Sequence, residues 1–203
     1  MSPEEALELV LDKQENCGID YMLTGSFASN MHGMPGTTYD ADIVIKVEPS
    51  ALDELVRSLG DEFYFSREAA REAVSSRSMF NVVHLETGFK VYFIIRKTRP
   101  FSEEEFSRRE KGVFLGEPRW FATPEDVILA KLEWSQLGQS ERQFLDAVNV
   151  AKVQGEKLDR SYLEKCEIGG VRKIVNCDTA FSLSPMSQLR NRRSISRLFR
   201  RIC

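Results

Sequence analysis

Two aspartates open a short apolar run in the first quarter of the chain. Asp40 and Asp42 stand on either side of one alanine, and the apolar residues 43–45 follow directly. Because alternate residues of a β-strand share a face, the two carboxylates are expected to project side by side, about 7 Å apart. Like charges held this close on a half-buried sheet make poor structural sense unless a cation lies between them. Mg²⁺, which binds one or two carboxylates together with substrate phosphates, suits this pattern.

A corner of small residues lies upstream of the aspartates. The apolar run Tyr21–Leu23 leads through a threonine into Gly25 and Ser26, and a helix-compatible piece, residues 27–32, ends at Gly33. Backbone N–H groups at a glycine turn that opens a helix can bind a phosphate, and glycine allows the phosphate to approach closely. The two features together predict a clamp for a triphosphate followed by a clamp for a metal.

The order apolar–Gly–Ser, thirteen intervening residues, then Asp–apolar–Asp–apolar resembles the nucleotidyltransferase superfamily, which includes polymerase beta and the aminoglycoside nucleotidyltransferases. Within it, the chain is most similar to the small bacterial proteins of that fold, several of which are antitoxin-like. The resemblance covers roughly residues 7–163. A second interpretation makes Gly25 a helix cap and leaves Asp40 and Asp42 solvated on an edge strand, but the spacing and order favour the clamp.

The resemblance implies an α+β nucleotidyltransferase fold, with a mixed central sheet flanked by helices and a helical C-terminal part. It implies transfer of a nucleoside monophosphate from a nucleoside triphosphate to an acceptor hydroxyl. Gly25 and Ser26 would hold the triphosphate, while Asp40 and Asp42 would be the catalytic residues that bind Mg²⁺. A protein, an RNA end or a small molecule could each supply the acceptor.

One position departs from the pattern of this fold. Relatives often carry a third carboxylate in a Lys–apolar–Asp–apolar context, and here residues 90–93 place Tyr92 at that position. A tyrosine does not replace an aspartate, because its phenol is neutral near pH 7 and offers one weak oxygen ligand. A hairpin with a two-residue turn at residues 87–88 would pair Tyr92 with Val83 and put Glu86 on the opposite face. The site is therefore expected to be degenerate, and a non-catalytic, antitoxin-like module that binds a nucleotide or a protein is the alternative function.

The segment 123–151 resembles the helical C-terminal part of the same small proteins. Lys131, Arg142 and Asp146 are the polar residues that match it. As cations, Lys131 and Arg142 are candidates to bind a phosphate of the nucleotide. The alternative is that each forms an ordinary salt bridge on a helix surface.

Composition indicates an ordinary globular protein. The 203 residues are 42% hydrophobic and 29% charged, with a net charge of −3. No apolar run approaches the roughly 18–20 residues of a membrane span, the acidic N-terminus is unlike a secretory signal, and the four cysteines lack a Cys–x–x–Cys pair. A cytoplasmic protein is therefore expected.

Residues 166–203 hold eight basic and two acidic residues, so residues 1–165 hold 20 basic and 29 acidic ones. This acidic body argues against an extended nucleic-acid groove.

The sequence predicts three parts: a nucleotidyltransferase-like core at 1–122, a helical part of the same unit at 123–165, and a basic tail, flexible in part, at 166–203. Apolar residues near the end of the tail fall at helical spacing among arginines. Such a segment suits a protein partner, an anionic surface, nucleic acid or its own domain. The two histidines, His32 and His84, are expected to be a helix-end residue and a packing residue.

Overall fold

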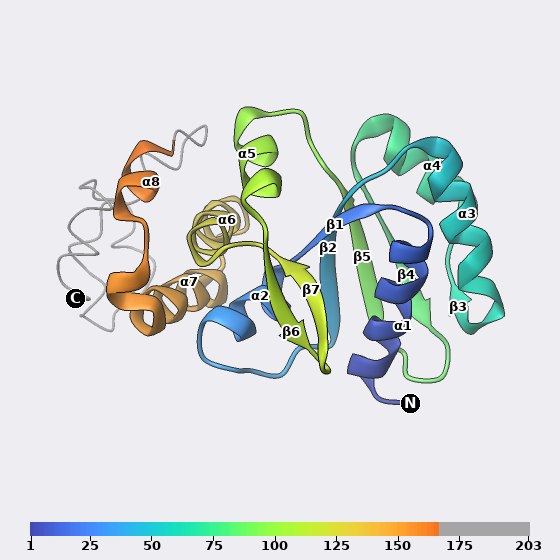
Figure 1. Ribbon diagram of the computed structural model, residues 1–203, viewed down its shortest axis with the longest axis horizontal. Coiled ribbons are helices and arrows are strands. Elements are labelled where there is room, and N and C mark those ends of the chain that lie inside the picture. Colours follow the sequence, from blue (N-terminus) through green and yellow to red (C-terminus); the bar gives the residue numbers. More distant parts are fainter. Residues whose placement is uncertain (167–203) are drawn as a thin grey trace. The chain divides into compact units, whose positions relative to one another are not determined.

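The computed structural model describes residues 1–166, so the predictions for the basic tail after Cys166 lie outside the described residues. The described chain is α+β, as predicted (Figure 1). Its helices are α1 (Pro3–Asn16), α2 (Gly25–His32), α3 (Pro49–Leu59), α4 (Arg67–Ser76), α5 (Pro100–Arg108), α6 (Pro124–Leu137), α7 (Glu141–Gln154) and α8 (Arg160–Lys165). Its strands are β1 (Asp20–Thr24), β2 (Asp40–Lys46), β3 (Phe63–Tyr64), β4 (Met79–His84), β5 (Lys90–Ile95), β6 (Glu110–Phe114) and β7 (Glu117–Phe121). Among residues 1–166, no helix is long and apolar enough to cross a membrane.

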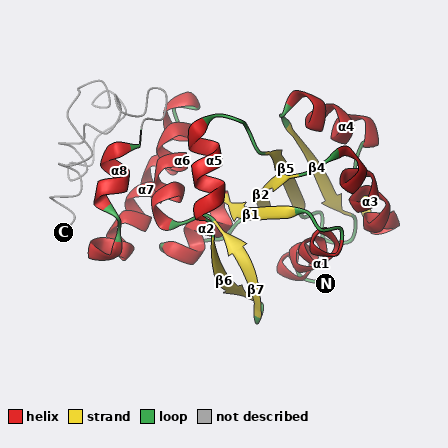
Figure 2. Cartoon of the chain, turned by 45° about the horizontal axis from the view of Figure 1, so that its top comes forward, coloured by secondary structure: helices red, strands yellow, loops and turns green. Residues whose placement is uncertain are grey.

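The strands form one mixed sheet in the order β3-β4-β5-β2-β1-β7-β6. β2 runs parallel to β5 and antiparallel to β1, while β1 runs parallel to β7. The hairpin of β6 and β7 forms one edge of the sheet (Figure 2). A mixed sheet with helices is the predicted fold class.

The chain divides into two compact units, and the sheet belongs to the first, which comprises Met1–Phe27 and Thr37–Ala122. Along β2 and β5, buried and half-buried residues alternate, so one face of the sheet carries the core. Ile43, Ile45 and Phe93 on that face are fully buried. Helices α1, α3 and α4 pack together, and α4 lies along β4 (Figure 1). The other face carries Asp40 and Asp42, the two aspartates of the candidate site.

The second unit comprises Ala28–Gly36 and the chain from Thr123 onward. Thr123 precedes helix α6 and caps it, because its hydroxyl accepts a hydrogen bond from the Asp126 amide at 3.3 Å. The Tyr162 hydroxyl of α8 donates to Asp126 Oδ1 at 2.6 Å, which connects α8 to α6. Gln154 of α7 donates to the carbonyl of His32 at 2.6 Å, which connects α7 to the end of α2.

Several sequence expectations about helices are wrong in detail. The charged segment 103–111 suits a helix from its sequence, but helix α5 ends at Arg108 and the chain then enters β6. Trp134 and Leu145 fall at helical spacing with apolar neighbours on α6 and α7, which predicts burial, but 52% of Trp134 and 49% of Leu145 are exposed. A helical period identifies an apolar stripe, but the neighbouring elements decide which part of it is buried.

Candidate active site

The corner between β1 and α2 meets the second aspartate directly. Thr24 is the antiparallel partner of Asp42, so the next residue, Gly25, lies against the aspartate side chain. Gly25 has φ +61°, and a Cβ built on it would lie 2.0 Å from Asp42 Oδ2. Only glycine fits here, because any other residue would both strain the backbone and displace the carboxylate. The fold thus places the Gly25 corner, predicted to bind phosphate, next to Asp42, predicted to bind metal.

Asp40 lies on the same face of β2 as Asp42, as the strand alternation predicts. Both are half-buried, and the buried residues Ala41 and Ile43 alternate with them. The Thr38 hydroxyl is 2.9 Å from the Asp40 carbonyl oxygen and 3.1 Å from Asp40 Oδ1, so it orients this side chain where the strand begins. Two carboxylates on one strand face, with the first turn of α2 beside them, can bind Mg²⁺ that arrives with a triphosphate.

Tyr92 lies beside Asp42 on the neighbouring strand. The parallel register of β2 and β5 pairs Asp42 with Tyr92 and Asp40 with Lys90. Partners in adjacent strands share a face, so Tyr92, the position where the sequence resemblance leads us to expect a third carboxylate, lies on the same face as Asp42. Within residues 1–166, no group of three or more His, Cys, Asp or Glu residues could hold a metal ion. The residues present therefore fit a metal that the two aspartates and the nucleotide bind together.

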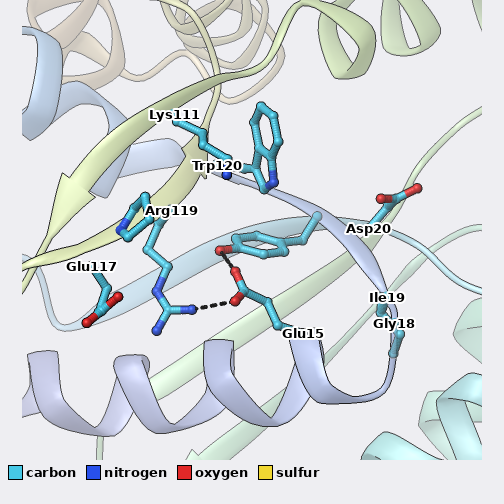
Figure 3. Close-up of a pocket in the computed structure, with 10 residues that line it drawn as sticks. Glu15, Gly18, Ile19, Asp20, Lys111, Glu117, Arg119 and Trp120 are labelled. Atoms are coloured by element: carbon cyan, nitrogen blue, oxygen red, sulfur yellow. Dashed lines mark hydrogen bonds and ion pairs between the residues drawn. The ribbon is translucent and has the colours of Figure 1, made fainter.

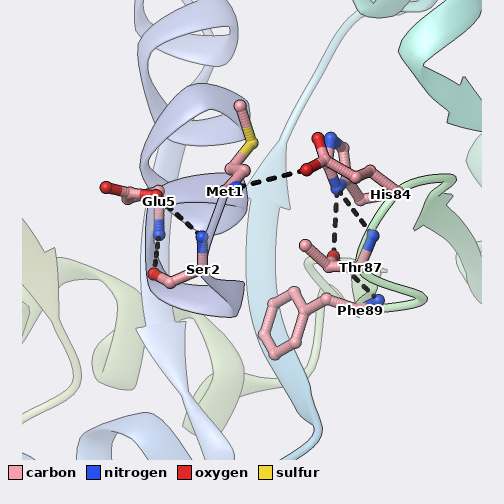
Figure 4. Close-up of polar contacts among 7 residues, drawn as sticks. Met1, Ser2, Glu5, His84, Thr87 and Phe89 are labelled. Carbon is pink, nitrogen blue, oxygen red and sulfur yellow. Dashed lines mark hydrogen bonds and ion pairs between the residues drawn. The ribbon is translucent and has the colours of Figure 1, made fainter.

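The register expected for the hairpin of β4 and β5 is wrong by two residues. Tyr92 pairs with Asn81, and the strands are joined by five residues, 85–89. At the start of this loop, His84 Nδ1 lies 3.0 Å from the Thr87 hydroxyl (Figure 4), and Gly88 takes φ +67°. These contacts stabilise a longer turn than the two-residue one. Glu86 forms an ion pair with the N-terminal amine, so it is no substitute for the missing acid (Figure 4).

Lys131 and Arg142 belong to the second unit, apart from the residues grouped in the first. The Lys131 side chain is 4% exposed, and its ammonium lies 2.9 Å from Asp146 Oδ2. This buried pair differs from the expected salt bridge on a helix surface. Arg142 is exposed on α7. The first unit brings together Gly25, Ser26, Asp40, Asp42 and Tyr92.

A second polar region, which the sequence did not predict, surrounds Arg119 of β7. Its guanidinium binds the carboxylates of Glu8, Asp12 and Glu15, which lie along α1. The pKa of Arg119 is lowered by burial, but the hydrogen bonds to the three carboxylates outweigh this effect and raise it above its usual range. The spacing of these acids, four and three residues apart, places them on one side of a helix and is the signal that could have predicted a cation there.

The Arg119 cluster lines a pocket of about 380 Å³ at the start of β1 (Figure 3). Tyr21, which is 1% exposed, donates a hydrogen bond to Glu15 at 2.6 Å. Burial raises the pKa of Tyr21 well above its usual range, and the hydrogen bond to Glu15 adds to the effect. The Lys111 ammonium lies 5.2 Å from the centre of the Trp120 ring. Because the ion pairs of Arg119 connect β7 to α1 within the first unit, we interpret this pocket as a structural feature of the fold.

No protein-family model and no curated protein sequence matches the chain. Solved structures do match. The antibiotic-resistance factor ANT(2'')-Ia has a TM-score of 0.53 at 10% identity, over 76% of this chain and 85% of its own. The lincosamide antibiotic adenylyltransferase LnuA, lincomycin-bound, has a TM-score of 0.53 at 13% identity, over 73% and 96%. An antigenic nucleotidyltransferase-like protein from Paracoccidioides brasiliensis has a TM-score of 0.50 at 16% identity, over 72% and 75%.

At these identities the likeness concerns the backbone rather than individual side chains. It agrees with the mixed sheet flanked by helices. The chain therefore has the nucleotidyltransferase fold, as its sequence predicts.

Proposed function

We propose that the chain is a metal-dependent nucleotidyltransferase, which moves a nucleoside monophosphate from a nucleoside triphosphate to an acceptor hydroxyl. The contact of Gly25 with the Asp42 carboxylate carries this proposal. It sets the first turn of α2, where backbone N–H groups point toward the helix N-terminus, beside a carboxylate that can bind a metal. Solved structures of the same fold include antibiotic adenylyltransferases, which supports transfer of a nucleotide as the class of reaction.

Each candidate site residue of the first unit then has a proposed role. Gly25 allows a phosphate to approach the backbone, and Ser26 offers its amide and hydroxyl to the triphosphate. Asp40 and Asp42 bind Mg²⁺, which when bound neutralises charge on the triphosphate and on the leaving pyrophosphate. The acceptor oxygen forms a bond to the α-phosphorus as the bond to the bridging oxygen breaks, and pyrophosphate leaves with the electron pair. The neutral phenol of Tyr92 is no base, so the acceptor proton passes to solvent.

We also propose Lys131 and Arg142 of the second unit as cations that bind a phosphate. Lys131 is 4% exposed and forms an ion pair with Asp146, so Arg142 is the more accessible of the two. Arg142 is exposed on α7, and its guanidinium can bind a phosphate with two parallel hydrogen bonds.

One observation favours a second candidate, a non-catalytic module that binds a nucleotide or a protein. Tyr92 pairs with Asp42 where a third carboxylate would bind metal and accept the proton. Phosphoryl transfer depends almost entirely on positioning and on neutralising charge. The loss of one carboxylate ligand therefore strongly reduces the stabilisation of the transition state. At about 1.4 kcal/mol per factor of ten, a loss of several kcal/mol slows the reaction a hundredfold or more.

Transfer of label from an α-labelled nucleoside triphosphate tests both candidates. Acceptor pools of protein, RNA and small hydroxyl compounds are each offered with Mg²⁺. We expect weak transfer by the natural chain and a gain in transfer of a hundredfold or more on Tyr92→Asp. The control Tyr92→Phe should show no gain over the natural chain. Asp42→Asn should abolish transfer. Fast turnover by the natural chain that falls on Tyr92→Asp would show that the tyrosine itself works in the site, and no transfer by either chain would favour the binding module.

A further inference from the structure

Lys90 lies on the candidate site without a role in the account above. It is the parallel partner of Asp40 and lies on the same face of the sheet as Asp42 and Tyr92. Its side chain is exposed. In the part of the chain that the structure describes, no carboxylate forms an ion pair with its ammonium. The backbone of Lys90 therefore lies one strand spacing, about 4.8 Å, from that of Asp40, and the lysine charge is available to a ligand.

Packing fixes where Lys90 stands relative to the corner. The preceding residue, Phe89, is 3% exposed, and its ring packs edge-on against Phe27 with 6.2 Å between ring centres. Phe27 directly follows Ser26, so this contact joins the start of β5 to the first turn of α2. The Phe89 amide also donates to the Thr87 hydroxyl at 3.2 Å, which holds the turn before Lys90 (Figure 4). Lys90 and Ser26 thus lie at the same end of the sheet, on two sides of Asp40 and Asp42.

The charges on this face set how many metal ions it can hold. Asp40, Asp42 and Lys90 together carry −1, and Tyr92 adds nothing near pH 7. An aspartate in place of Tyr92 would make the face −2 and give a second metal ion a ligand. Instead, the lysine supplies a fixed positive charge, and a lysine ammonium binds phosphate as a point charge.

We propose that Lys90 binds a phosphate oxygen of the nucleoside triphosphate and that the face holds one divalent cation. This inference rests on the proposed function, because it assigns a further residue and a metal count to the same site. Lys90 would neutralise part of the triphosphate charge that a second metal ion would otherwise neutralise. The alternative is a solvated lysine on an exposed strand end that contributes nothing to binding.

Calorimetric titration with α,β-methylene ATP and Mg²⁺ tests the first half. Lys90→Gln should weaken binding about tenfold, the size expected for one hydrogen bond between charged groups. Lys90→Arg should keep the affinity within about threefold, since the charge remains. The matched control is Lys46→Gln, an exposed lysine at the other end of β2. Equal affinities of Lys90→Gln and Lys46→Gln would overturn the assignment of Lys90.

Counting Mn²⁺ by electron paramagnetic resonance, with the same analogue bound, tests the second half. One Mn²⁺ per chain is expected, rising to two on Tyr92→Asp. Two ions per natural chain would overturn the single-cation inference while leaving the proposed function standing. A natural chain that binds neither nucleotide nor metal would overturn the proposed function, and this inference with it.

Discussion

The carboxylates near the two ends of β1 have different kinds of neighbours. At its start, Arg119 binds three carboxylates of α1, of which Figure 3 shows Glu15, and Tyr21 donates to that same carboxylate. At its end, the chain places a glycine against Asp42, and the neighbouring Asp40 lies beside the short hydroxyl of Thr38. A large cation fills the first region, whereas the second is built from small residues. We interpret the difference to mean that the acids around Arg119 stabilise the fold, and we propose that Asp40 and Asp42 bind a ligand.

Removing Arg119 should produce the largest loss of stability. Arg119→Met leaves three carboxylates close together without their cation, and the side chain it replaces is 4% exposed. We expect the free energy of unfolding to fall by about 3 kcal/mol. Arg71→Met is the matched control, because Arg71 forms an exposed ion pair with Asp53 at 2.9 Å and should cost under about 1 kcal/mol. Denaturation in urea measures both, and equal losses would remove the contrast between the two ends of β1.

Adding one methyl group at the other end should cost less stability but remove binding. Gly25→Ala has to accept φ +61° and a Cβ 2.0 Å from Asp42 Oδ2. We expect a loss of about 2 kcal/mol, of which roughly half is backbone strain. The control is Gly88→Ala, where φ is +67° but nothing lies within 4 Å of the added Cβ. If both variants lose the same stability and bind Mg²⁺ with ATP equally well, the contact with Asp42 has no importance for the site.

The smallest effect concerns alkaline pH. The pKa of Tyr21 is raised by burial and by Glu15, so above about pH 10 the unfolded chain loses this proton while the folded chain keeps it. The unfolded state then binds fewer protons, and stability falls as pH rises, by up to about 1.4 kcal/mol per pH unit. Tyr21→Phe should make this fall less steep between pH 9 and 11. The pKa of Tyr162 is raised as well, so part of the slope stays. Parallel curves for the two chains would contradict the assignment.

Local patterns in the sequence were enough to predict the clamp. Gly25, Asp40 and Asp42 depend on a turn and on the alternation of one strand, and both are properties of neighbouring residues. The position of Tyr92 was also predicted, although its partner on β4 was not, because the His84–Thr87 contact lengthens the turn. Single-sequence patterns describe side chains along one element well, and they describe the loops between elements less well.

Contacts between distant residues could not be predicted in the same way. The partners of Arg119 on α1 lie 111 and 107 residues away in the sequence, and only the folded sheet brings them together. The burial of Lys131 against Asp146 likewise depends on how α6 packs on α7. For the same reason, helical spacing suggested a buried Trp134 that the structure leaves half exposed.

Thermal unfolding with and without ATP and Mg²⁺ tests most directly whether the face of Asp40 and Asp42 binds a nucleotide and its metal. A ligand that binds only the folded state stabilises it by about 2.7 kcal/mol at a hundredfold excess over Kd, so the natural chain should melt at a higher temperature with both present. The variant Asp40→Asn with Asp42→Asn should lose this rise. The control Glu54→Gln with Asp61→Asn, which also removes two acids from exposed positions of the first unit, should keep it. A rise of the same size in the Asp40 and Asp42 variant would contradict the account and show that the ligand binds elsewhere.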